Sequence, residues 1–592
     1  MKKCLLVLFA FFCVFPAIAQ NDNGKWNVDL SILAGTNFSN KNTSEENLDY
    51  FSNSLGEFTA SASYRTSIVK LNISAGASAA RKFTENTGVS YTEYDDGDFD
   101  LSLDGGYSKE SSWKTNLGAA LEWNPGKGNT FNFFLRSNFA ADSPKKYNIT
   151  TVNTSSGDDF GFGNTTELVD NLSSTSSAGV SFLHKFDKPG RELSAGLEGS
   201  LAYSDKCSEW ILATISSETD IGKIYRITPV QYNGDYTARV GYVDKDFLDI
   251  PKLDFDVSVK AFLKTTVDHQ SAANCDIEGK CWVDSTSYRE NFDFSRLTLS
   301  PKLRGVYSVG IWKFDLAYNP ELALYKLDSD SHKGDITKDS WAHLYDCSVS
   351  LLPWTGGEFR IAGVRTISRP SYLQTCWFIR SGSYVNEYYV GNPDLLPSST
   401  YNTTLGYKHD FGVFSTSLTA GYKHEADKIE SIITNDDIEG VDSRIYTWIN
   451  GGKADNMVAT LTFGWNIVRS LKASVTGNYN YFVGTTTSGS VTRNSDFNVS
   501  GEASFRLKTW SFLFKGRYQS KIIRSYSEIE DVVGCDVRID KSFKHFDIFL
   551  DCRDIFDKPV LVTTYNEDKS SYRAEQSVGN KRIFLLGLKY KF

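Results

Sequence analysis

The sequence predicts an all-β fold, a transmembrane antiparallel β-barrel of about 22 strands, with a range of about 20 to 24. Three observations predict it. Extended segments alternate between apolar and polar side chains, short connections take turns with long ones, and the chain ends on a two-faced strand closed by Phe592. A strand with lipid on one side and water on the other needs this alternation, because successive side chains point to opposite faces.

The first residues read as a secretory signal, residues 1–19. Lys2 and Lys3 precede an apolar stretch, and Ala17 and Ala19 form a small-x-small cleavage site. The apolar stretch is too short to span a membrane, so an anchor is disfavoured. We expect residues 20–57 to be a short N-terminal extension with one candidate strand, at 25–39, and residues 58–592 to form the barrel.

Composition agrees with a barrel although the mean hydropathy of −0.33 resembles that of a soluble protein. Alternation hides the hydrophobicity of a barrel from any average. Aromatic residues make up 14%, with 31 Tyr and 39 Phe, and rings settle at membrane interfaces. The net charge of −9 gives no support for nucleic-acid binding, which needs basic stripes.

The clearest strands lie in the middle and at the end of the chain. Residues 252–264 alternate apolar side chains with Lys, Asp and Ser, Phe262 being the one exception on the polar face; residues 471–481 and 510–519 behave alike. In residues 581–592 the face of Phe584, Leu586 and Leu588 is apolar. A half-buried edge strand of a soluble sheet is the alternative for any single segment, but so many two-faced strands would need a second layer to cover them.

The connections predict the orientation. Short turns are expected near residues 124–129, 187–190, 309–310, 353–357, 410–412 and 469–470. Long loops are expected at 141–172, 204–233, 268–290, 326–340, 371–398, 432–456 and 559–580, and a longish turn at 84–97. With the C-terminus in the periplasm, parity puts the long loops outside a Gram-negative outer membrane.

Several motifs follow one another in the last third of the chain. They are Arg369-Pro-Ser-Tyr372 with Pro370, the run Gly391-Asn-Pro-Asp-Leu-Leu-Pro397 with Asn392 and Pro393, Leu405-Gly-Tyr407, Asp554-Ile-Phe-Asp557 and the terminal Phe592. In this order they resemble the barrel of TonB-dependent receptors and the related outer-membrane β-barrel protein family. Ser398 stands where that family usually has Glu. Pro393 and Pro397 stiffen the loop and Gly391 permits a turn, which favours a structural role for the run over ligand gating.

The resemblance implies a role in uptake of a substrate across the outer membrane. Full receptors carry a plug domain before the barrel, whereas residues 20–57 are too short for one, so we expect a plug-less barrel. Expected partners are outer-membrane lipid and lipopolysaccharide, the barrel-assembly machinery, and a separate plug or surface lipoprotein. The alternative is a non-transporting surface barrel, an adhesin or scaffold that displays its loops.

Aromatic residues of the loops 371–398 and 432–456 are the candidate ligand-binding residues, because rings stack on sugars and peptides. They are Tyr384, Tyr388, Tyr389, Tyr446 and Trp448. Mutual packing of these rings is the simpler alternative. Cys275 and Cys281 are a candidate disulfide, with a free pair equally open. A metal site that includes His269 would lack a fourth ligand and is not expected.

The sequence carries none of the common catalytic motifs. The sequence has no Gly-x-Ser-x-Gly elbow, phosphate-binding loop or His-Glu-x-x-His zinc motif. Residues 328–334 resemble a calcium loop, but the glycine is one place late and no closing Glu follows. We therefore expect a protein that is not an enzyme and that needs no cofactor.

Overall fold

The computed structural model describes most of the chain. The described residues are 25–37, 53–93, 99–154, 161–215, 220–276, 283–284, 291–329, 336–376, 379–381, 387–438, 441–468, 470–523, 527–556, 558, 560–565, 571–579 and 582–591. Strands account for nearly all of them. Phe592, Tyr384 and Cys281 lie outside the described residues.

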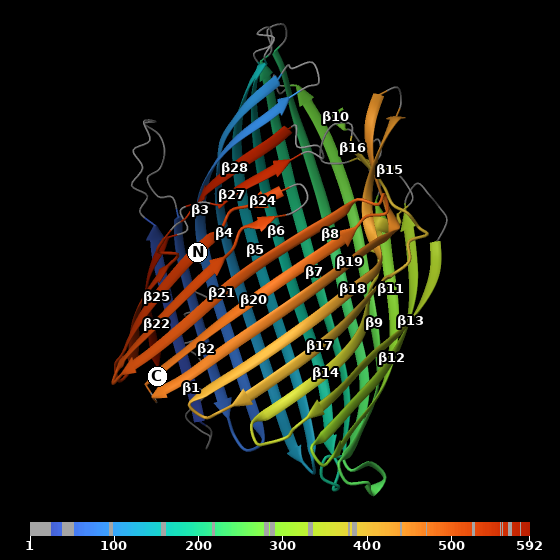
Figure 1. Cartoon of the computed structure of the whole chain (residues 1–592), viewed down its shortest axis with the longest axis vertical. Coiled ribbons are helices and arrows are strands. Elements are labelled where there is room, and N and C mark those ends of the chain that lie inside the picture. The colour runs from blue at the N-terminus through green and yellow to red at the C-terminus, as the bar shows by residue number, and fades with distance from the viewer. Residues whose placement is uncertain are drawn as a thin grey trace.

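Twenty-two strands form one closed antiparallel ring, because β1 pairs with β2 on one side and with the last strand, β29, on the other. The predicted barrel and its strand number are confirmed (Figure 1). In chain order the ring strands are β1 (Lys25–Asn37), β2 (Asn53–Arg65), β3 (Val69–Glu93), β4 (Phe99–Gly126), β5 (Asn129–Thr154), β6 (Gly161–Lys185), β7 (Glu192–Ile215), β8 (Asp220–Asp244), β9 (Leu253–Asp276), β11 (Phe292–Val309), β12 (Trp312–Ser329), β13 (Ile336–Leu351), β14 (Gly357–Ser368), β17 (Ser398–Asp410), β18 (Phe414–Ile438), β19 (Val441–Val468), β20 (Leu471–Thr485), β21 (Val491–Leu507), β22 (Trp510–Gln519), β25 (Val532–Ser542), β26 (Phe546–Arg553) and β29 (Ile583–Lys591).

The remaining elements are short and lie beside the ring or in its connections. They are β10 (Val283–Asp284), β15 (Ile379–Ser381), β16 (Glu387–Val390), β23 (Ile522–Ile523), β24 (Ser527–Ile529), β27 (Val560–Tyr565), β28 (Ser571–Gly579), the helix α2 (Tyr372–Thr375) and the 3-10 turn η2 (Phe247–Asp249). Among the described residues, no helix is both long and apolar enough to cross a lipid bilayer.

The last strand has the two faces that its sequence predicts. Leu586 is 62% exposed and lies between the exposed Phe584 and Leu588, whereas Leu585 is fully buried. Gly587 points inward with Leu585, and a Cβ there would collide with the ring of Phe549. Because successive side chains alternate, the exposed apolar face meets lipid and the opposite face meets the lumen.

A girdle of rings marks the end of the barrel at which the strands turn tightly. Phe411 and Phe414 stack at 4.3 Å, Phe543 and Phe546 stack at 4.4 Å, and Trp354 meets Phe359 edge-on. Each pair flanks a short turn of the ring, and such rings settle where hydrocarbon gives way to headgroups. The girdle therefore fixes one boundary of the membrane-facing band.

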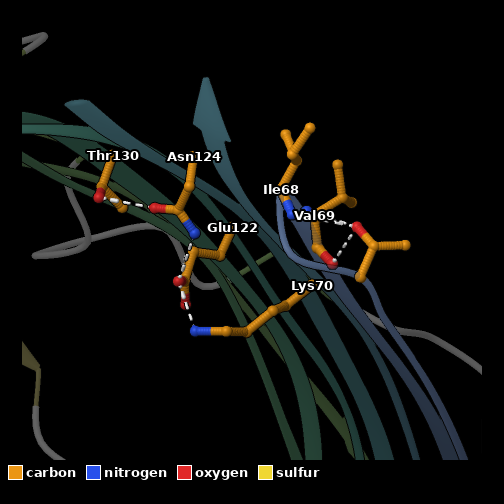
Figure 2. A network of polar contacts seen from close by, with 7 residues as sticks. Ile68, Val69, Lys70, Glu122, Asn124 and Thr130 are labelled. Carbon is orange, nitrogen blue, oxygen red and sulfur yellow. Dashed lines mark hydrogen bonds and ion pairs between the residues drawn. The ribbon is translucent and has the colours of Figure 1, made fainter. Parts of the chain in front are cut away.

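Polar side chains on the lumenal side tie the first strands together at this turn end (Figure 2). Lys70 of β3 donates to Glu122 of β4 at 2.5 Å, and Asn124 donates to the same carboxylate oxygen at 2.9 Å. Thr130 of β5 in turn donates to Asn124 at 2.7 Å. Cross-strand pairs of this kind stabilise a sheet wherever opposite charges face one another.

A second polar cluster lies at the turn end, where the turn between β6 and β7 meets the last residue of β8. Asp244 is almost fully buried, and its carboxylate lies 3.1 Å from Lys188 and 3.1 Å from Arg191. Burial by itself would raise the pKa of Asp244. The hydrogen bonds from the two cations outweigh burial, so the pKa lies below its ordinary value.

The short turns occur where the sequence predicts them, at the end of the barrel that carries both Lys25 and Lys591. The predicted long loops differ. Residues 141–172, 204–233 and 432–456 are mostly extended hairpins of β5–β6, β7–β8 and β18–β19, with strands of 24 to 28 residues. Above the membrane both faces of a hairpin are wet, so the apolar alternation fades while the hydrogen-bonded ladder continues.

Residues 84–93 are also not part of a turn at the periplasmic side, contrary to the expectation for 84–97. The stretch 84–92 continues β3 toward the loop end, with β4 on one side and β28 on the other. Above the short strand β2, the strand β28 takes over as the neighbour of β3, and β27 and β24 continue this second tier (Figure 1). These strands raise the wall over the short ring strands near the chain ends.

The first strand of the ring comes from the predicted extension 20–57. β1 pairs along eight positions with β29, from Asp29 opposite Lys591 to Thr36 opposite Phe584. The candidate strand at 25–39 is therefore a barrel strand, and the ring begins at Lys25 rather than near Phe58.

Candidate functional site

The connection between β14 and β17, residues 369–397, contains two of the five sequence motifs, and we call it the strap. It begins with Arg369, whose side chain is only 6% exposed. Its guanidinium donates twice to Glu321 of β12, at 2.5 and 2.9 Å, and once to Ser340 of β13 at 2.6 Å. A planar guanidinium suits such a forked contact. The motif arginine therefore anchors the strap to the inner wall.

The next turn of the strap packs onto the lumenal face. Tyr372 of α2 receives a hydrogen bond from Gln231 of β8 at 2.5 Å and donates to Asp268 of β9 at 3.4 Å. Its ring lies 5.0 Å from Phe292 and 5.9 Å from Phe294, both on β11. All four partners come from the inward faces of their strands, so α2 lies inside the barrel.

A local cap and a buried cysteine fix the geometry of α2. Ser371 and Gln374 form a capping box, in which each side chain accepts from the other's backbone N–H. Cys376 is fully buried and packs with Phe292, Phe294 and Leu327 in a small apolar cluster. The helix has one turn, so these contacts rather than helix propensity hold it in place.

The run from Gly391 to Pro397 returns the strap to the wall as a brace. A Cβ on Gly391 would collide with the backbone of Cys376, which explains the glycine. Asn392 receives a hydrogen bond from the Asp394 amide at 2.9 Å and donates to the carbonyl of Trp448 at 3.0 Å. The φ of Gly391 is not positive, so the residue does not serve a turn conformation as expected. A glycine is needed because the backbones of Gly391 and Cys376 approach closely.

Both flanks of the strap are tied to neighbouring strands. Lys338 of β13 donates to the carbonyl of Pro393 at 2.7 Å. On the other flank Asn450 of β19 exchanges two hydrogen bonds with the backbone of Leu396, at 2.7 and 2.9 Å. Beneath the brace lies a small, mainly apolar cavity of about 210 Å³ lined by Pro393, Pro397 and Trp341 among others.

Three of the five predicted aromatic residues come together. Tyr389 of β16 stacks on Tyr446 at 5.0 Å and on Trp448 at 6.1 Å, both of β19. The cause is a parallel pairing of β16 with β19 that places Tyr389 opposite Tyr446. Tyr388 is the adjacent residue of β16 and points to the other face. These rings pack on one another, as the simpler alternative has it, and binding by their outer faces stays a prediction.

Other predicted positions carry no structural test. Tyr384, Cys281 and Phe592 lie outside the described residues, and the side chain of Cys275 is likewise not described, so the disulfide stays a prediction. Within the described ranges, no cluster of three or more His, Cys, Asp or Glu side chains has the arrangement of a metal site.

Sequence reasoning missed one group of cations on the lumenal wall. Lys260 and Lys264 stood on the polar face of the strand predicted at 252–264, but their neighbours on β8 and β11 depend on register. The register places Arg239 opposite Lys260, and Arg296 opposite Lys264. No single strand shows this grouping, because the partners lie about 20 to 40 residues apart in the chain.

Known proteins resemble this chain in part of its sequence and in its fold. Residues 356–590 match the model of the "Outer membrane protein beta-barrel family". No curated protein matches the sequence. Among solved structures, the chain resembles "Copper transporter OprC" with a TM-score of 0.59 and 11% identity, covering 96% of this chain and 80% of that one.

Two further structures have the same fold. The ferric citrate transporter FecA gives a TM-score of 0.58 at 10% identity, with 96% of this chain and 79% of that chain covered. The ferripyoverdine receptor of Pseudomonas aeruginosa gives 0.59 at 13% identity, with 97% and 72% covered. These similar proteins are transporters and receptors, not enzymes. Residues 356–590 are therefore similar to the outer membrane protein beta-barrel family, and the whole ring has the fold of these outer-membrane transporter and receptor barrels, in agreement with the resemblance that the motifs indicate.

Proposed function

We propose that this barrel takes part in uptake of a solute across the outer membrane. The observation that carries the proposal is the strap, which leaves the rim after β14 and folds onto the inner wall through Arg369 and Tyr372. A barrel that merely displays loops has no use for side chains held against its lumen. The likeness to copper, ferric citrate and ferripyoverdine proteins supports a transporter-like barrel at the level of the fold.

In this proposal the loop end faces the cell exterior and the turn end faces the periplasm. The half-buried rings of Tyr389, Tyr446 and Trp448 meet the solute first, since rings offer stacking faces. The solute then passes the strap and moves along a polar wall. A separate plug or surface lipoprotein is the proposed partner that closes the lumen, and lipopolysaccharide and the barrel-assembly machinery are its proposed membrane partners.

Uptake in a deletion strain tests the function. The strain is complemented with the wild-type gene or an empty vector, and uptake of copper salts, ferric chelates, oligosaccharides and peptides is measured. We expect at least one solute to enter only with the wild-type gene. Identical uptake in both strains for the whole panel, together with no current through the purified barrel in a planar bilayer, would instead support the display role.

A further inference from the structure

Four basic side chains occupy one patch of the lumenal wall, and we call them the cationic quartet: Arg239, Lys260, Lys264 and Arg296. They lie on three adjacent ring strands, β8, β9 and β11. Their chain neighbours Val240 and Val259 are 56% and 50% exposed on the lipid side. Because successive side chains alternate, the quartet points inward.

The strand register sets these cations against one another. Arg239 is the direct cross-strand partner of Lys260, and Lys264 is the direct partner of Arg296. Like charges placed directly opposite destabilise a sheet. Two such pairs on the inward face of β9 lower the stability of the sheet. The barrel fold by itself does not require them.

Two other arginines of the lumenal wall show the usual remedy, a carboxylate partner, which the quartet lacks. Arg304 is paired with Asp315 at 2.5 Å, and Arg517 with Asp554 at 3.3 Å. Within the part of the chain that the structure describes, no member of the quartet has an ion pair. The Nε atom of Arg296 is buried without any hydrogen-bond partner. The positive charge of the patch is therefore not neutralised, whereas Arg304 and Arg517 are each paired with a carboxylate.

Two carboxylates face the same region and leave the excess uncancelled. Asp235 is opposite Lys264, and Glu198 is opposite Thr237, one inward position from Arg239. Neither forms an ion pair with the quartet, and even when Asp268 at the strap is counted, four positive charges stand against three negative ones.

The strap lies immediately on the loop side of this patch. Asp268, which accepts from Tyr372, is two inward positions beyond Lys264 on β9. Phe294, which packs on the same ring, is the next inward residue after Arg296 on β11. A solute that passes the strap therefore meets the quartet next.

We propose that the cationic quartet is a lumenal binding site for a multivalent anion, a solute that carries several carboxylates or phosphates. The two guanidinium groups offer forked donors to planar oxyanions, and the two ammonium groups add charge that adapts to shape. Rings or patches of Arg and Lys select anions in pores in the same way. As the substrate class of uptake, this inference rests on the proposed function, whereas binding itself is measurable without transport.

The full-length protein in detergent tests the site, with tricarballylate and inorganic pyrophosphate as probes. Binding is measured by titration calorimetry for the wild type, for Lys264→Gln/Arg296→Gln and for the matched variant Lys515→Gln/Arg517→Gln. The matched variant also removes two positive charges from the lumen, but from cations that already have the partners Glu502 and Asp554. We expect the first variant to lose affinity by about tenfold or more, as for a lost charge-assisted hydrogen bond, and the second to stay within about twofold.

Folding is checked independently by the mobility shift of heated and unheated samples on gels. The variant Lys260→Gln removes one charge of the repelling pair with Arg239, and the partner of Lys260 on β11 is the uncharged Ser300, so we expect its unfolding temperature to equal or exceed that of the wild type. Equal loss of binding in both double variants, or no binding of either probe to the folded wild type, would overturn the site. If the purified protein binds a probe through the quartet while the complemented strain shows no uptake, the proposed function is overturned and the binding site stands.

Discussion

Replacing Arg369 by Ala should release the strap from the lumenal wall. The substitution removes both hydrogen bonds to Glu321 and the one to Ser340. The carboxylate of Glu321 is then left with only the weak contact from Ser300 at 3.4 Å. While the strap is closed, Glu321 lies beneath it, so its negative charge is left without a partner where little water reaches it.

The size of the effect follows from burial. The arginine side chain is 6% exposed and that of Glu321 is 19% exposed. Removing one partner of a buried pair costs about 3 to 5 kcal/mol, and the partial exposure of the carboxylate favours about 3 kcal/mol. This cost lowers the ratio of closed to released strap by about a hundredfold, since 1.4 kcal/mol is a factor of ten.

Limited trypsin digestion measures the ratio of closed to released strap, because trypsin cleaves after arginine and Arg380 lies in the strap on β15. Where opening is fast, cleavage follows the population of the open form. We expect cleavage after Arg380 to accelerate about a hundredfold in Arg369→Ala, within the limit set by fully open chains. The double variant with Glu321→Ala should be cleaved more slowly than Arg369→Ala, because no charge is left stranded.

The matched control is Arg304→Ala, which breaks a similar forked pair with Asp315 between β11 and β12, away from the strap. It should loosen the wall without faster cleavage after Arg380. The reasoning is refuted if Arg369→Ala leaves the cleavage rate at the wild-type value, or if Arg304→Ala raises it equally.

Three further outcomes follow from the structure. Gly391→Ala should free the strap by a similar trypsin assay, because its Cβ has no room beside Cys376; unchanged digestion would show that the backbone yields there. Leu586→Arg should lower stability in lipid vesicles by about 2 to 4 kcal/mol in urea unfolding, whereas Thr476→Arg on the lumenal face, between the uncharged Thr462 and Ser500, should not. Asp244 has a lowered pKa in the folded barrel, so its stabilising contribution is present above its unfolded pKa and is lost as pH falls through its folded pKa. The unfolding temperature of Asp244→Asn should thus converge on that of the wild type in acid, and a gap that stays constant with pH would contradict this.

The motif run was recognisable from sequence, but its physical role was only half predicted. Pro393 and Pro397 indicated a stiff connection, and the structure shows a brace hydrogen-bonded on both flanks. Gly391 was explained by turn conformation, whereas steric room decides it. The inward fold of Tyr372 had no sequence signal, since a tyrosine in a loop can face solvent, lumen or lipid with the same neighbours in the chain.

The sequence by itself determined the two-faced strands, the tight turns and the closing aromatic strand. Lipid on one side and water on the other impose an alternation of period two, which is visible within each strand whatever its pairing register. Only the tertiary structure decided that β1 meets β29, that long stretches without apolar alternation remain strands, and that the quartet shares one patch. Those features depend on which residues stand opposite one another across strands. Cross-strand register is set by the closure of the whole ring, so no local stretch of sequence contains it.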